Sequence, residues 1–370
     1  MNSAHVIIVS AQPIPNLIPI ISAMPATVHL LVSDKMDLQS VRLIRFLEER
    51  NIRCVGHSIN PYNMGQVETV CRGILENTEA GSITLNATGG TKIAAFGAFA
   101  AFRELGFPII YFDPEKWRMI RLDVNGQPPE KAEAELNVSD YLSLHGFKVS
   151  SDAGDDETVL ERRNLTDWLS KNLPESGLMP ILNQFASEAQ EKKIFPFVKN
   201  IMGYFNSSFI GVLKKLASEN IIGWDSKTRA ITFPTIDAAR YIGGFWLEEY
   251  VFDVVKSLGV HDVRRNVNVV WDGSGIKNEF DVVFTHKCRL FLISCKTSKL
   301  GHEKQYKDKN PVYELDSLKD AAAGLFGQGV LVSASPLGGE LKKRADTLRL
   351  VSINAEEIKW LATKLKIELK

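Results

Sequence analysis

The residues best suited to carry out chemistry lie in two apolar runs in the C-terminal half of the chain. Asp281 belongs to the first run, and Ser294 and Lys296 belong to the second. Two apolar runs on either side of a short polar connection are typical of a β-hairpin. A turn centred between Lys287 and Cys288 places Asp281 opposite Ser294, within one residue. Because side chains alternate along a strand, Ser294 and Lys296 share a face, and we expect all three to converge at one end of the hairpin.

A carboxylate and an amine at one place suit the cleavage of a phosphodiester bond. A carboxylate such as Asp281 binds Mg²⁺ or Mn²⁺, and the metal polarises the phosphoryl group and acidifies a water molecule. The Lys296 amine would position the water or neutralise the charge that develops in the transition state. A plain amphipathic hairpin with solvated ends would show the same pattern.

A second carboxylate is expected from the helix predicted at 245–255. Helical spacing gives this helix an apolar stripe of Leu247, Tyr250, Val251, Val254 and Leu258. Glu248 falls at the edge of the stripe, and Glu249 is expected to face solvent. A carboxylate at an apolar edge requires a cation or a metal, so Glu248 is the better candidate, with a simple ion pair as the alternative.

A local excess of positive charge follows the first strand of the hairpin. The whole protein has 44 basic and 44 acidic residues, so it has no overall field that would attract a polyanion. The basic residues of this segment are Lys287, Arg289, Lys296, Lys299, Lys304, Lys307 and Lys309, against the acids Glu303 and Asp308. Such a patch would bind a phosphate backbone, although a solvated lysine-rich loop has the same composition.

The first 125 residues alternate short apolar strands with helices. Strands are predicted at 5–10, 27–32, 52–59, 82–86 and 108–112, and helices at 38–50, 64–77 and 93–105. This order predicts a doubly wound parallel sheet, in which ligands bind beyond the carboxyl ends of the strands. The helix at 93–105 is apolar on nearly all sides and rich in small residues, which indicates packing against the sheet or a dimer interface.

Polar loops follow three of these strands and would form the rim of a ligand site. They contain Ser10, Gln12, Asp34, Lys35, Asn86, Thr88, Gly89, Gly90, Thr91 and Lys92. In the 86–92 loop the glycines allow close backbone approach, and the N–H groups of the following helix favour an anion. The loop matches neither GxxxxGK[ST] nor GxGxxG, which excludes a P-loop nucleotidase and a dinucleotide-dependent oxidoreductase. Tight turns with capping threonines remain the alternative.

The rest of the chain indicates further parts and a reduced compartment. Residues 150–158 read as a linker, and 160–235 as mainly helical with a winged-helix-like pattern at 209–233. The domains are therefore expected at 1–150, 151–236 and 237–370. The four cysteines form no CxxC pair, which disfavours zinc and suggests a cytoplasmic protein. Prolines interrupt the N-terminal apolar stretch, so neither a signal peptide nor a membrane span is expected.

Taken together, the chain resembles the CARF-domain effector nucleases of type III CRISPR antiviral systems, in the branch that joins a CARF sensor to a PD-(D/E)xK nuclease. The resemblance covers nearly the whole chain. It is carried by the βαβ order, by the 86–92 loop, and by the segments 245–248, 278–281, 295–297 and 313–318. It implies a Rossmann-like CARF domain, a winged-helix-like connector and a restriction-endonuclease-like α/β domain.

The same resemblance implies a function. The CARF half would bind a cyclic oligoadenylate, the tetra-adenylate, across a homodimer, through the rim residues of the three polar loops. The nuclease half would then cut DNA and/or RNA, as single strands or by nicking duplex, with Mn²⁺ or Mg²⁺. Its catalytic residues would be Asp281, Lys296, Glu248 and Ser294.

One position departs from the family motif. The family usually has Glu or Asp two residues before the lysine, where this chain has Ser294. The metal would then be held by Asp281, Glu248, the Cys295 carbonyl and water, with a contribution from Glu279 if its side chain faces the site. The departure leaves open an alternative, a ligand-responsive nucleic-acid-binding regulator with an inactive nuclease fold. Against it, the helix predicted at 209–217 carries only two lysines, which is little for reading DNA.

Overall fold

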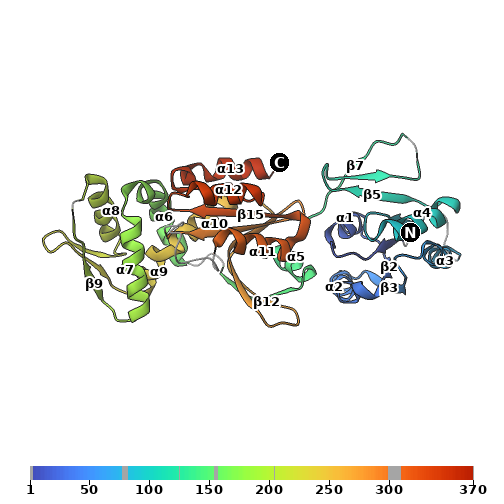
Figure 1. Cartoon of the computed structure of the whole chain (residues 1–370), viewed down its shortest axis with the longest axis horizontal. Coiled ribbons are helices and arrows are strands. Elements are labelled where there is room, and N and C mark those ends of the chain that lie inside the picture. The colour runs from blue at the N-terminus through green and yellow to red at the C-terminus, as the bar shows by residue number, and fades with distance from the viewer. Residues whose placement is uncertain are drawn as a thin grey trace. The chain divides into compact units, whose positions relative to one another are not determined.

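The computed structural model describes residues 3–76, 82–124, 126–153, 157–203, 205–298 and 310–369. The chain divides into two compact units (Figure 1). The first consists of Met1–Lys148 with Gly324–Phe326, and the second of Val149–Ala323 with Gly327–Lys370. The finer division at 150 and 236 stays a prediction.

The first unit is built on a seven-stranded sheet in the order β3-β2-β1-β4-β5-β6-β7. Its strands are β1 (Ala4–Ile8), β2 (Thr27–Val32), β3 (Arg53–Ser58), β4 (Ile83–Asn86), β5 (Ile109–Asp113), β6 (Arg118–Arg121) and β7 (Glu130–Lys131). Its helices are α1 (Ile14–Ala23), α2 (Asp37–Glu48), α3 (Met64–Leu75), α4 (Lys92–Glu104) and α5 (Val138–Leu144). The strands β1 to β5 are parallel, and β6 and β7 are antiparallel. The predicted doubly wound parallel sheet is confirmed.

Helices cover both faces of this sheet. The helices α3 and α4 pack on one face, where Cys71, Ala98 and Phe102 are fully buried. Helix α1 contacts strands β1 and β5, and helix α2 contacts strands β2 and β3. The α4 residues Ile93 and Phe96 are 41% and 60% exposed. The small residues of α4 therefore face the core, and two of its large apolar side chains do not.

The second unit contains a six-stranded sheet in the order β16-β15-β14-β13-β12-β8. Its strands are β8 (Phe147–Ala153), β12 (Asp262–Trp271), β13 (Lys277–His286), β14 (Arg289–Lys296), β15 (Gly327–Ser333) and β16 (Val351–Ile353). The helices that accompany it are α6 (Glu157–Ser176), α7 (Met179–Lys192), α9 (Ile236–Arg240), α10 (Trp246–Ser257), α11 (Pro311–Ala323), α12 (Gly339–Thr347) and α13 (Leu361–Glu368). The predicted linker at 150–158 is wrong in part, because 150–153 end strand β8 and 157–158 begin α6. Residues 154–156 lie outside the described residues.

Alternation along the strands divides the residues of this sheet between its two faces. Val282, Phe284, Phe291 and Ile293 belong to a large core that also contains residues of α6, α7, α9 and α10. Helix α11 contacts β14 and β15. Since neighbouring residues of a strand point to opposite faces, the positions between those core residues face α11.

A three-stranded antiparallel sheet and helix α8 (Ser207–Ser218) form the middle of the chain. The sheet has the order β10-β11-β9, from β9 (Phe197–Asn200), β10 (Gly223–Asp225) and β11 (Ala230–Phe233). Helix and strands lie where the winged-helix-like pattern predicted them. Apolar residues of α8 and β11 belong to the same core as α10 and the hairpin.

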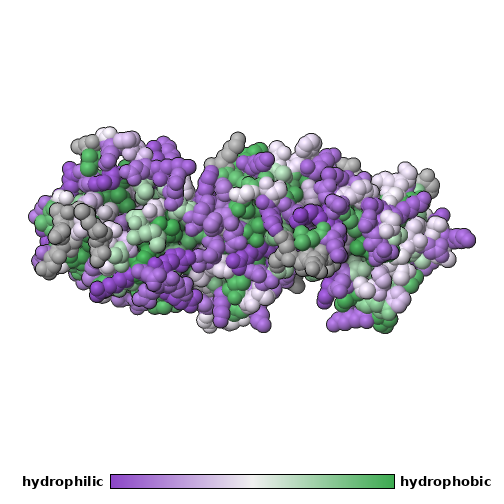
Figure 2. Space-filling view, turned by 180° about the vertical axis from the view of Figure 1, so that it is seen from behind, coloured by the Kyte–Doolittle hydropathy of each residue, from purple (hydrophilic) through white to green (hydrophobic). Residues whose placement is uncertain are grey.

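The surface is that of a protein with scattered apolar residues. On the face shown in Figure 2, hydrophilic residues predominate, with hydrophobic residues among them. Single exposed apolar side chains are normal on globular proteins. Within the described ranges, no helix has the length and apolar character needed to cross a membrane.

Candidate active site and ligand pocket

The hairpin β13–β14 turns where the sequence predicts. Lys287 and Cys288 form the turn, with φ of 50° and 51°. Positive φ at both central residues is the geometry of a type I′ turn, whose twist matches that of the paired strands. The pairing runs from His286 opposite Arg289 to Val282 opposite Ile293. This register brings the next pair, Asp281 and Ser294, together.

Asp281 is held by the strand opposite it. Its Oδ2 accepts a 2.6 Å hydrogen bond from the Cys295 backbone N–H and lies 3.4 Å from the Ser294 hydroxyl. The Lys296 Nζ lies 3.7 Å from the same oxygen, and both side chains are partly exposed. The predicted convergence of Asp281, Ser294 and Lys296 is confirmed. The carboxylate has a fixed orientation and a cation beside it.

These three side chains open into a cavity of about 50 Å³ on the α11 side of the sheet. Glu279 and Glu314 also line this cavity, together with Leu315 and Leu318. Glu279 is two residues before Asp281, so a regular strand presents both carboxylates on one face. Glu314 comes from α11 and was not predicted as a site residue, because nothing in its helical pattern relates it to the hairpin.

Glu248 approaches the same end of the hairpin from α10. The strand end after Lys296 is tied to the segment before α10, since the Thr297 hydroxyl donates to the Gly243 carbonyl at 2.6 Å. A Cβ added at Gly244 would lie 3.9 Å from both Glu248 Oε1 and Thr297 Oγ1, so the carboxylate lies beside this strand end. Burial, with Asp281 and Glu279 adding to it, raises the pKa of Glu248 to about 8. At neutral pH the Glu248 carboxyl therefore holds its proton unless a cation is bound beside it.

The neighbouring carboxylate, Glu249, does not face solvent as expected. It is 1% exposed and forms an ion pair and bidentate hydrogen bonds with Arg162 of α6. The Arg162 guanidinium also lies over the Tyr241 ring, 4.4 Å from its centroid. The charge of this buried carboxylate is compensated by its arginine, so it does not require a metal. Glu248 therefore remains the better candidate for a metal ligand, because Glu249 is paired with Arg162 and not because Glu249 faces solvent.

In the first unit, a pocket of about 610 Å³ lies at the carboxyl ends of β1, β2 and β3. Five of the predicted rim residues line it: Ser10, Asp34, Lys35, Gly90 and Thr91. Ligands of doubly wound sheets bind at this edge. The volume is that of a small-molecule site rather than of a single ion.

Comparison with known proteins identifies both units. The model of the Card1 CARF domain matches residues 4–141, and that of the Card1-like endonuclease domain matches 236–368. The chain belongs to the CARF-domain effector nucleases. The family resemblance inferred from the sequence is confirmed. Among curated proteins, none matches this chain.

Solved structures share the arrangement over the whole chain. Can2 from Sulfobacillus thermosulfidooxidans, in complex with cyclic tetra-adenylate, is 26% identical with a TM-score of 0.83, covering 100% of this chain and 97% of its own. Protein VC1899 from Vibrio cholerae is 22% identical with a TM-score of 0.83, covering 99% and 98%. A type III CRISPR defence DNA nuclease activated by cyclic oligoadenylate is 16% identical with a TM-score of 0.53, covering 94% and 52%. The last two show similarity of fold alone.

The other predicted rim residues of the CARF domain do not line its pocket. They are Gln12, Asn86, Thr88, Gly89 and Lys92. Asn86 is fully buried, and its side chain holds α1 and the loop together through the Pro15 and Asn16 carbonyls and the Thr88 N–H. Thr88 Oγ1 in turn accepts from the Phe112 N–H. These two residues shape the loop instead of facing the pocket.

Sequence reasoning missed the third strand's contribution to the pocket. Ser58, Asn60, Pro61, Tyr62 and Gln66 line it, and they follow or flank the end of β3. Tyr62 is 70% exposed, so its ring is free to contact a ligand. The rule that located the other rim loops applies equally here, because this polar loop also follows a predicted strand.

The carboxylates of the endonuclease site could bind a divalent cation, although they are not arranged as a complete set of metal ligands. Within the described part of the chain, no three His, Cys, Asp or Glu side chains are grouped as a metal site. Burial first, and then the charge of Asp281, raises the pKa of Glu248, so the charged form of this carboxylate lacks a compensating cation. A bound cation would compensate this charge.

The predicted basic patch is not one surface in the described residues. Lys287 and Arg289 lie at the turn, where they donate to the Leu369 and Glu368 carbonyls. Lys296 lies at the opposite end of β14, roughly 23 Å away at the rise of a β-strand. The other four basic residues fall in 299–309, outside the described residues. The hairpin thus contributes one lysine to the active-site end.

Proposed function

We propose that this chain is a metal-dependent endonuclease of type III CRISPR defence, activated when cyclic tetra-adenylate binds its CARF domain. The observation that carries the proposal is the meeting of Asp281, Lys296 and the buried Glu248 at one hairpin end. Similarity to Can2, whose structure contains cyclic tetra-adenylate, supports the choice of activator.

Asp281, Glu248 and the Cys295 carbonyl would hold Mn²⁺ or Mg²⁺. The cation would polarise the scissile phosphate and lower the pKa of a water molecule. Asp281 is oriented for this task by the Cys295 N–H and by Ser294. The Lys296 amine, 3.7 Å from Asp281, is placed to orient a nucleophilic water or to neutralise charge on the phosphate.

The activator would bind in the 610 Å³ pocket and across a homodimer. Asp34 and Lys35 offer exposed charged groups, and the Gly90–Thr91 backbone precedes the N-terminus of α4, where an anion is favoured. The exposed Ile93 and Phe96 of α4 provide apolar surface for a second subunit. Binding would shift the population toward a competent arrangement of the nuclease domains.

The test combines activator, metal and substrate. The protein is incubated with Mn²⁺, with and without cyclic tetra-adenylate, on labelled single-stranded DNA, single-stranded RNA and supercoiled plasmid. Cleavage that requires both additions, and that EDTA abolishes, is the expected result. Equal cleavage without the activator would contradict gating. Binding of the activator with no cleavage of any substrate would favour the regulator with an inactive nuclease fold, for which Ser294 is the supporting observation.

A further inference from the structure

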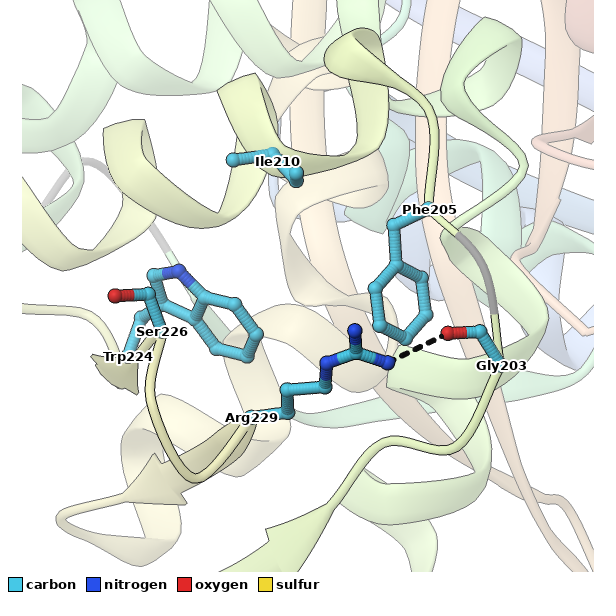
Figure 3. Close-up of a pocket in the computed structure, with 6 residues that line it drawn as sticks. All are labelled: Gly203, Phe205, Ile210, Trp224, Ser226 and Arg229. Carbon is cyan, nitrogen blue, oxygen red and sulfur yellow. Dashed lines mark hydrogen bonds between the residues drawn. The ribbon is translucent and has the colours of Figure 1, made fainter.

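A second pocket, of about 400 Å³, lies in the middle segment of the chain and has no part in the proposed chemistry. It is lined by Gly203, Phe205, Ile210, Trp224, Ser226 and Arg229. These residues come from the three-stranded sheet, its turn, and the region around the start of α8 (Figure 3). The lining combines two aromatic rings, one aliphatic side chain and one guanidinium.

The guanidinium of Arg229 is held by a backbone carbonyl and lies beside the Phe205 ring. Figure 3 shows the Trp224 and Phe205 rings on opposite sides of Arg229, with Ile210 across the open space. Arg229 donates to the Gly203 carbonyl at 2.9 Å, and its guanidinium carbon lies 5.6 Å from the Phe205 ring centroid. Phe205 is itself supported by Phe209, with ring centroids 4.5 Å apart. The pocket wall is thus a supported aromatic surface with a cation at its rim.

The charge of Arg229 is not neutralised by Asp225, the acid at the start of the same turn. Asp225 is engaged in the turn, where it accepts from the Lys227 N–H and the Thr228 hydroxyl. No carboxylate among the described residues forms an ion pair with Arg229. Because Arg229 is exposed and also paired to a carbonyl, its remaining N–H groups are available to an anion.

The segment around the pocket is positively charged. Residues 192–233 contain seven basic residues and two acidic residues, in a protein whose net charge is zero. Of the two acids, Glu219 pairs with Lys215, and Asp225 is engaged in the turn. A local positive field beside an aromatic pocket is complementary to a polyanion that carries flat rings.

We propose that this pocket binds an unpaired base of a single-stranded nucleic acid, stacked on the aromatic surface, while Arg229 meets the adjoining phosphate. Proteins that bind single strands combine a basic surface with rings on which bases stack. The bases of a duplex are already stacked and are not free to enter. The recognition helix of a winged helix would instead read the duplex, but α8 carries only Lys214 and Lys215. The pocket would thus hold substrate strand away from the cleavage site.

Direct binding tests the proposal without reference to cleavage. Fluorescence anisotropy of labelled 12-nucleotide dT and rU strands is measured with the full-length protein in EDTA. Trp224→Leu and Arg229→Gln are each expected to weaken binding about 10-fold, the scale of one stacked base. The control is Lys227→Gln, which removes the same charge from the same turn but does not line the pocket, and it should change binding less than about two-fold.

Three results would overturn the proposal. One is wild-type affinity in Arg229→Gln, a surface variant whose thermal unfolding should match that of the parent protein. Another is equal weakening in Arg229→Gln and Lys227→Gln, which would mean that binding depends only on the positive charge of the segment and not on the pocket. The third is an equal dependence on Trp224 for a blunt duplex of the same length. None of these depends on nuclease activity, so the proposed function stands or fails separately.

Discussion

The two candidate sites of this nuclease differ in volume and in the structural elements that supply their polar groups. The pocket of the CARF domain is about 610 Å³ and is lined by loops beyond three strand ends, whereas the hairpin cavity is about 50 Å³ and takes its groups from paired strands and flanking helices. The large pocket suits an extended ligand with several polar edges. The small cavity suits an ion and the phosphate that the ion contacts.

The charged groups of the two sites also differ in burial. Asp34 and Lys35 are exposed at the pocket rim. Glu248 is buried beside other carboxylates, and its pKa is raised to about 8 in consequence. Exposed groups contribute binding energy that solvent screens, whereas a buried carboxyl beside other carboxylates becomes charged at neutral pH only when a cation compensates its charge. We therefore expect single substitutions to have larger effects at the hairpin than at the pocket rim.

Removing the charge of Asp281 should produce the largest effect. Asp281→Asn keeps the shape of the side chain but loses the anion that would hold the metal, and Lys296→Ala removes the amine beside it. Each should reduce the cleavage rate with Mn²⁺ and cyclic tetra-adenylate by about 1000-fold, a loss typical of key charged groups in active sites. Initial rates on a labelled substrate measure this.

The control for these variants separates the two sites. Glu356→Gln removes an exposed carboxylate elsewhere in the second unit and should retain the parent rate. Calorimetric titration of cyclic tetra-adenylate should give one affinity for all four proteins. A variant of Asp281 that still cuts at the parent rate would remove the hairpin from the chemistry.

Gly90 offers a large effect on stability in the CARF domain. Its φ is +81°, and an added Cβ would overlap the Ile8 side chain. Gly90→Ala should therefore destabilise this domain by about 3 kcal/mol, from overpacking together with backbone strain. The matched control is Gly106→Ala, with a φ of +74° but open space at Cβ, which should cost about 1 kcal/mol. Urea unfolding distinguishes them, and equal losses would show that Ile8 yields freely.

These sites also differ in what sequence reasoning could establish. Alternation in paired strands was enough to bring Asp281, Ser294 and Lys296 together, because the register determines every side-chain direction. A loop has no such rule. Asn86 and Thr88 had the right chemistry for a ligand, but contacts with α1 and β5 turned them to structural roles.

Long-range partners account for the remaining errors. The helical pattern placed Glu249 toward solvent, since helical spacing contains no information about Arg162, which lies 87 residues earlier in the chain. The same holds for Glu314, which reaches the hairpin cavity only because α11 packs on β14. The order of strands and helices was predictable because hydrophobic periodicity is local.

Two lysines near the CARF pocket provide a sharper comparison. Lys35 lines the pocket, and Lys92 does not, although the sequence placed both at the rim. Lys35→Ala should weaken binding of cyclic tetra-adenylate about 10-fold, because a charge-assisted contact with a phosphate is lost. Lys92→Ala should weaken it by no more than about two-fold. Calorimetric titration measures both, and the reverse ranking would mean that the ligand binds outside this pocket.

Substitution of Ser294 tests whether a cation binds at this end of the hairpin. Ser294→Asp would place another carboxylate beside Asp281, and without metal this repulsion should lower the stability of the protein by about 1 kcal/mol. With Mn²⁺ the sign should reverse, because an added carboxylate ligand tightens binding, and bound metal stabilises the folded state by mass action. Ser294→Asn, which has the same shape without the charge, should show neither change. Thermal unfolding in EDTA and in Mn²⁺ tests this, and an identical response of the Asp and Asn variants to Mn²⁺ would mean that no metal binds at this hairpin end.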